Sequence, residues 1–207
     1  VAGIKKHEMR LASKVISFLF HPMLMATIGM YLILNIGPLS SILGADGKRL
    51  IYLIVFFSTA VLPVSLLPLF YQFGVIKSFQ MESSRERVVP VMMTAFFYFL
   101  GYLLLKRLGV TGLIAGFMQA TVIATIGAGL VSYYWKISMH TIGIGGLAAA
   151  TYAMSIHYSV DLSWILALIF LLAGLVGSAR LYLGAHKPSQ VYAGFLWGFL
   201  IVLGALI

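Results

Sequence analysis

Seven apolar stretches, each close to the length that crosses a bilayer, dominate this chain of 207 residues. They run over residues 15–36, 50–73, 88–105, 112–134, 140–157, 162–179 and 189–207. A helix needs about 20 apolar residues to cross the hydrocarbon layer. Only helices and closed barrels satisfy their own backbone polar groups in lipid. The pattern therefore predicts an all-α polytopic transmembrane bundle with six or seven spans, forming a single domain over residues 1–207.

Composition and charge agree with a chain whose main partner is the lipid bilayer. Hydrophobic residues make up 61% of the sequence, against 14 Lys and Arg and 5 Asp and Glu. Soluble domains are nearer one quarter charged. The chain has no cysteine, which excludes disulfides and cysteine metal sites. The net charge of +9 lies in short loops and in a basic segment, residues 1–14, that is expected to rest on the membrane surface. Lipid head groups or phosphorylated substrates, and not nucleic acid, are the expected partners.

Polar side chains concentrate in three connecting segments, residues 77–90, 133–143 and 177–195. They follow the second, fourth and sixth apolar stretches, so all three are expected on one face of the membrane. The positive-inside rule does not fix which face this is. Once the basic residues of these three segments are set aside as candidates for an anion site, the two faces carry equal numbers of Lys and Arg.

The third segment, which includes "SARLYLGAHKPSQ", contains a candidate functional histidine. Pro188 suits the first turn of the last helix, and if the chain is helical or nearly so from His186 onward, His186 and Gln190, four residues apart, can touch. The Gln190 carbonyl would then hold one ring nitrogen of His186 and leave the other free to attack or to bind. Arg180 supplies a planar cation suited to phosphate oxygens, and Lys187 adds a second charge.

The other two segments repeat this combination of a helix start and cations. Ser138 is a candidate N-cap, and it would place His140 in a first turn whose free N–H groups favour an anion. Lys136 stands just outside that turn, and Arg85 and Arg87 precede the start of another span. Together the three segments predict one oxyanion site near the membrane surface.

These motifs resemble the type 2 phosphatidic acid phosphatase (PAP2) superfamily over roughly residues 77–200. The third signature of that family is Ser-Arg, five residues, His, three residues, Asp, and Arg180, His186 and Gln190 occupy its spacing. Its second signature, Pro-Ser-Gly-His, is similar to "ISMH", which keeps Ser138 and His140.

The first signature, a Lys followed after six residues by Arg-Pro, has no direct counterpart. The family spacing counted from Lys77 reaches Ser84, so Arg85 and Arg87 are assigned to this motif jointly.

The resemblance implies a lipid phosphate hydrolase in the inner membrane of a bacterium, with no metal and no cofactor. His186 would attack phosphorus to form a phosphohistidine, and His140 would protonate the leaving oxygen. The groups implied to hold the phosphoryl oxygens are Arg180, Lys136, Ser138, Arg85 and Arg87. Undecaprenyl or another polyprenyl diphosphate, phosphatidate and phosphatidylglycerophosphate are the substrates that such an enzyme would take.

Several positions depart from the family pattern. Ala179 replaces Ser, which removes one oxygen ligand, and Ile137 and Met139 replace the Pro and Gly of the second signature. Gln190 replaces Asp, so it can orient His186 but cannot stabilise a positive charge on it. Dolichyl-type polyprenyl-pyrophosphatases are similar in having Gln here, which favours a polyprenyl diphosphate. The alternative is a lipid-phosphate binder or transporter on the same scaffold, although no internal repeat typical of transporters is visible.

Two further histidines lie outside the motifs. His21, inside the first apolar stretch, is expected to be neutral and bonded to a neighbouring helix, although intramembrane ionisable groups are often functional. His157, with Asp161, is expected in a short loop on the opposite face.

Overall fold

The computed structural model describes residues 2–36, 39–79, 81 and 83–207, and every regular element in this part of the chain is a helix. The longer helices are α1 (Ala2–Leu19), α2 (Pro22–Asn35), α4 (Ala45–Phe56), α7 (Val88–Arg107), α8 (Gly112–Tyr134), α9 (Met139–Tyr158), α10 (Ser163–Tyr182) and α11 (Pro188–Leu206). The shorter ones are α3 (Leu39–Ile42), the π-helix η1 (Phe57–Val61), α5 (Leu62–Ser65), α6 (Leu67–Gln72) and the 3₁₀ turn η2 (Arg85–Arg87).

These helices form the predicted all-α polytopic bundle. Five helical segments are long and apolar enough to cross a membrane, namely Ala45–Gln72, Arg85–Arg107, Gly112–Tyr134, Ser163–Tyr182 and Pro188–Leu206. The bent pair formed by α1 and α2 makes a sixth if it crosses as one span. The protein is therefore an integral membrane protein.

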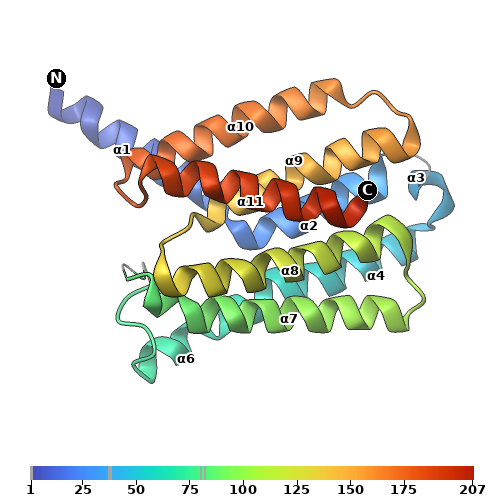
Figure 1. Ribbon diagram of the computed structural model, residues 1–207, viewed down its shortest axis with the longest axis horizontal. Coiled ribbons are helices and arrows are strands. Elements are labelled where there is room, and N and C mark those ends of the chain that lie inside the picture. Colours follow the sequence, from blue (N-terminus) through green and yellow to red (C-terminus); the bar gives the residue numbers. More distant parts are fainter. Residues whose placement is uncertain (1, 37–38, 80, 82) are drawn as a thin grey trace.

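The first predicted span, residues 15–36, is not continuous. Helix α1 ends at Leu19 and α2 begins at Pro22, with an angle of 55° between them. Proline has no N–H and cannot continue the preceding helix. The Nδ1 atom of His21 accepts a hydrogen bond from the Met23 backbone N–H at 3.4 Å and caps the new helix. Because of this break, α1 takes its own direction and its N-terminal part projects from the bundle in Figure 1.

The predicted span at residues 140–157 corresponds to α9, which is not among the five segments apolar enough to cross alone. Twelve of its 20 residues are buried, and it packs against α2, α10 and α11. A helix enclosed by other helices needs no lipid-compatible surface, which explains its small and polar residues. A Cβ atom at Gly145 or Gly198 would collide with the backbone of α11 or α9, so these two helices pack at very short range.

The three polar segments come together at one end of the bundle. Figure 1 shows the C-terminal ends of α8 and α10 and the N-terminal ends of α9 and α11 at the end from which α1 projects. This arrangement places the loops before α9 and α11 beside each other. The backbone N–H of Ser138 donates to the carbonyl oxygen of Gln190 at 3.2 Å and joins them directly.

Candidate functional site

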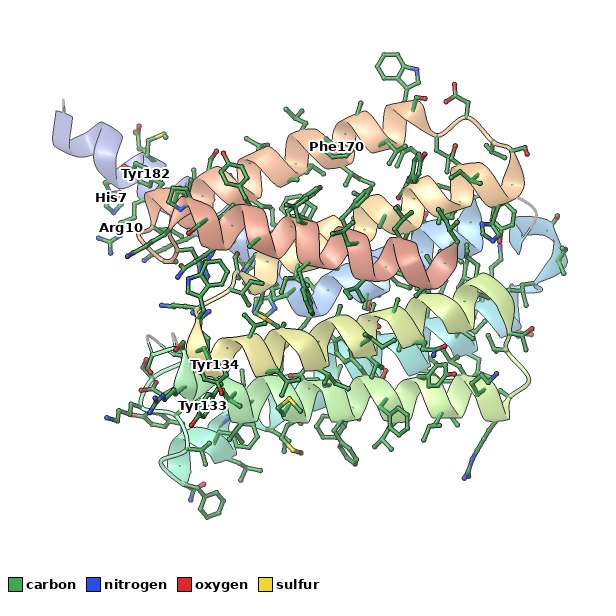
Figure 2. All side chains as sticks on the ribbon, viewed as in Figure 1. His7, Arg10, Tyr133, Tyr134, Phe170 and Tyr182 are labelled. Carbon is green, nitrogen blue, oxygen red and sulfur yellow. The ribbon has the colours of Figure 1, made fainter. Side chains whose placement is uncertain are left out.

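A cavity of about 1080 Å³ lies between the helices and reaches this polar end. Its cationic, histidine and serine lining residues are Arg10, Lys14, Ser17, His21, Arg87, Lys136, His140, Arg180 and His186. No Asp or Glu is among the described lining residues, so the charged groups that they bring to the cavity are cations, which suit an anion. Figure 2 shows Arg10 of α1 and Tyr133 of α8 on opposite sides of this end of the bundle.

The imidazole of His186 is held in one tautomer. Its Nδ1–H donates to the backbone carbonyl of Lys136 at 3.2 Å and to Oε1 of Gln190 at 3.3 Å. Both partners are acceptors, so Nδ1 carries the proton and Nε2 keeps a lone pair in the neutral ring. The backbone N–H of Lys187 also donates to Oε1 of Gln190 at 2.9 Å, which fixes the orientation of that amide. The contact expected from the four-residue spacing of His186 and Gln190 is therefore present.

The surroundings of His186 keep this ring neutral. Burial, together with the positive charges of Arg87 and Arg180, lowers the pKa of His186 to about 4. An unperturbed histidine has a pKa near 6.5. Near neutral pH the ring is therefore uncharged, and Nε2 is available as a nucleophile.

His140 and Arg180 are both tied to Ser17 on α1. The Nε2–H of His140 donates to the Ser17 carbonyl oxygen at 3.0 Å, and Nη1 of Arg180 donates to the Ser17 hydroxyl at 3.2 Å. The ring of His21 lies edge-on to that of His140, with 5.5 Å between centroids. The Nε atom of Arg180 is buried and has no hydrogen-bond partner among the described residues. A buried guanidinium N–H beside a cavity can donate to a bound oxyanion.

The structure separates the two arginines that the sequence left as alternatives. Arg87 lines the cavity, and its Nε–H donates to the carbonyl oxygen of Met81 at 3.0 Å. The guanidinium of Arg85 instead lies 5.3 Å from the ring centroid of Tyr133, and Arg85 is not a cavity residue. Arg87 is therefore the cation that this segment supplies.

Ser138 is the N-cap residue of α9, as expected from the sequence. Its side chain makes no capping bond, however, and it does not line the cavity. Its hydroxyl is buried, without a partner among the described residues. Its backbone holds Gln190, so Ser138 connects the two loops and does not face the cavity.

Three polar cavity residues on α1, together with His21 just beyond its end, were missed by reasoning from motifs. Arg10, Lys14 and Ser17 follow one another at intervals of four and three residues, which is one face of a helix, and His21 lies at the break between α1 and α2. The basic segment of residues 1–14 is thus part of a helix that contributes to the site. The expectation for His21 was also incomplete, because its described bond is to the backbone of its own helix and its ring neighbours His140.

Comparisons of the chain with protein-family models, with curated proteins and with solved structures find no match. The function of the site is therefore inferred from its residues and their geometry.

Proposed function

We propose that this protein is a membrane lipid phosphatase of the PAP2 kind, acting through a phosphohistidine. The observation that carries the proposal is the meeting of two histidines, His186 and His140, with Arg87, Lys136 and Arg180 on one cavity. The position of this cavity, at one end of a bundle of apolar helices, suits a substrate whose phosphate lies at head-group level.

The first step of the proposed reaction is attack by Nε2 of His186 on phosphorus. An N–P bond forms, the P–O bond to the leaving lipid group breaks, and the leaving oxygen takes a proton from His140, which must enter this step protonated on both ring nitrogens. A bound phosphate anion favours that doubly protonated ring. Because Nε2 of His140 is bound to the Ser17 carbonyl, Nδ1 is the atom that exchanges this proton. The surrounding cations stabilise the charge on the phosphoryl oxygens, which is the main requirement for phosphoryl transfer.

The second step restores the enzyme. Nδ1 of His140 accepts a proton from a water molecule, whose oxygen attacks phosphorus and breaks the N–P bond. Inorganic phosphate leaves, and Nε2 of His186 regains its lone pair. Gln190 holds Nδ1–H of His186 throughout, but its neutral amide stabilises the positively charged ring less than a carboxylate would.

Among lipid phosphates, the Gln190 resemblance favours a polyprenyl diphosphate such as undecaprenyl diphosphate, ahead of phosphatidate and phosphatidylglycerophosphate. The bacterial inner membrane is the corresponding location. The departures at Ala179 and Gln190 define the competing hypothesis, a protein that binds or carries a lipid phosphate without hydrolysing it.

The test is phosphate release from a panel of these lipids by the detergent-solubilised protein and by His186→Ala. We expect the variant to lose activity by about 10³-fold or more, since it lacks the nucleophile. His157→Ala is the matched control, because His157 lies near the far end of α9 and is not a cavity residue. Vanadate should inhibit the parent protein. Lipid binding without phosphate release by the folded parent would instead identify a binder or carrier.

A further inference from the structure

The cavity continues from the histidines deep into the bundle. On α8 its wall includes Thr125, Thr121 and Phe117, which lie progressively further from the polar end at Tyr134. With a rise of 1.5 Å per residue, Phe117 lies about 25 Å along the helix from Tyr134. On α11 the wall reaches Val202, about 21 Å from the start of that helix. The cavity is therefore a slot that follows the helices, and not only a pocket at the surface.

The deep part of the slot is mostly apolar. Its wall includes Met25, Ala26, Phe117, Ala124, Leu147 and Val202, and Tyr98 on α7, which also lines it, brings an aromatic ring with a hydroxyl.

The three threonines on the wall of the slot do not make it polar. The hydroxyl of each donates within its own helix, from Thr94 to Pro90 at 2.8 Å, from Thr121 to Met118 at 2.7 Å, and from Thr125 to Thr121 at 2.7 Å. These hydroxyl protons are thus already used. The slot suits a hydrocarbon better than water or a polar head group.

The cavity volume also exceeds what the head group alone needs. About 1080 Å³ is at the upper end of the range, roughly 300–1,000 Å³, that encloses whole drug-sized ligands. Phe18 and Phe79 line the cavity and are also 76% and 55% exposed, so the cavity reaches the outer surface between α1 and the segment before η2.

We propose that the slot binds one hydrocarbon chain, alkyl or isoprenyl, of the lipid whose phosphate lies at His186. This inference rests on the proposed function. Lipid tails are as apolar as the slot wall, so moving the chain from bilayer to slot gives little hydrophobic free energy. The slot therefore acts by positioning the phosphate and by selecting chain length.

The test fills the slot at its middle with Thr121→Phe and measures kcat/KM and lipid binding. Long-chain and short-chain lipid phosphates are compared with the water-soluble para-nitrophenyl phosphate. We expect the variant to lose roughly tenfold or more on the long-chain lipid and to match the parent on the other two. Leu130→Phe, which adds an aromatic ring to the exposed side of the same helix, is the control and should match the parent on all three substrates.

Thr94→Phe fills the slot from α7 and guards against a folding defect at Thr121. The slot proposal is wrong if both filling variants fold and lose kcat/KM equally on all three phosphates, or if neither loses any. The proposed phosphatase activity would still stand in either case. If the parent hydrolyses none of them, the proposed function fails. The binding measurements then test the slot separately. If the slot binds the hydrocarbon chain, the filling variants should have a lower affinity for the long-chain lipid and an unchanged affinity for the short-chain one.

Discussion

His186 and Gln190 form the contact whose chemistry is easiest to test by a single substitution. The pKa of His186 is lowered to about 4, so its ring becomes protonated, and loses its nucleophilic lone pair, as the pH falls through that value. Gln190→Glu places a carboxylate on Nδ1–H, which favours the charged ring and raises this pKa. We expect the acid limb of the kcat/KM profile against pH to move to higher pH. An acid limb that stays in place would mean that another group limits the reaction there.

Arg85 and Arg87 are two residues apart, yet only Arg87 lines the cavity. We expect Arg87→Ala to lower kcat/KM by about 10²-fold or more, as the loss of one donor to a transition-state oxyanion does. Among the described residues, Arg85→Ala removes the contact with Tyr133 and no cavity group, so it should stay within about threefold of the parent. Steady-state kinetics on one lipid phosphate compares the two, and equal losses would contradict the assignment.

Among the helices, α1 adds charged residues to the site that the sequence motifs did not predict. Arg10 and Lys14 lie on its cavity-facing side, where their charge would attract the anionic substrate that we propose. We expect the double variant Arg10→Ala, Lys14→Ala to raise KM about three- to tenfold with little change in kcat, since this charge acts on binding and not on the transition state alone. High salt should reduce the difference.

The matched control for this double variant is Lys106→Ala with Arg107→Ala. It removes the same charge from the last turn of α7, at the end of the bundle away from the polar segments. If both double variants raise KM equally, the rise is caused by the change in the net charge of the protein and not by the position of Arg10 and Lys14 on α1.

The packing of α9 against α11 holds together the two loops that precede these helices. A Cβ atom at Gly198 would collide with the carbonyl of Ile142, whereas one at Gly204, on the same helix, meets nothing within 4 Å. We expect Gly198→Ala to destabilise the protein by about 1–3 kcal/mol, the usual cost of overpacking. Gly204→Ala should be neutral or slightly stabilising, because alanine favours a helix over glycine. Thermal unfolding in detergent measures both, and equal melting temperatures would argue against the close packing.

For the whole molecule, the bundle places its site at one end, so the site faces a single side of the membrane. The absence of cysteine allows single labels to be introduced at chosen positions. Tyr134, at the polar end of α8, and Trp164, at the start of α10, are 85% and 88% exposed. We expect a membrane-impermeant maleimide added to intact cells to label only one of Tyr134→Cys and Trp164→Cys. Labelling of both would contradict the topology, and the reactive position identifies the side of the site.

The sequence by itself determined the features that depend on neighbouring residues. Apolar length predicted the membrane helices, because desolvation of the backbone in lipid is a local requirement. The spacing of His186 and Gln190 predicted their contact. His186 lies before α11, and the two side chains meet because Gln190, the third residue of that helix, turns its amide back toward the helix start. The break at Pro22 also has a local cause, the proline itself. The sequence nevertheless predicted one continuous span there, because residues 15–36 are apolar on both sides of the proline.

Only the tertiary structure decided which distant groups share the cavity. The choice of Arg87 over Arg85 depends on the direction of each side chain at the η2 turn, and motif spacing does not record that direction. The entry of Ser17 and His21 into the site depends on the 55° turn after α1 and on contact with α9, more than a hundred residues away in the chain. Such contacts are set by how helices pack in space, because packing, and not local periodicity, fixes which faces meet.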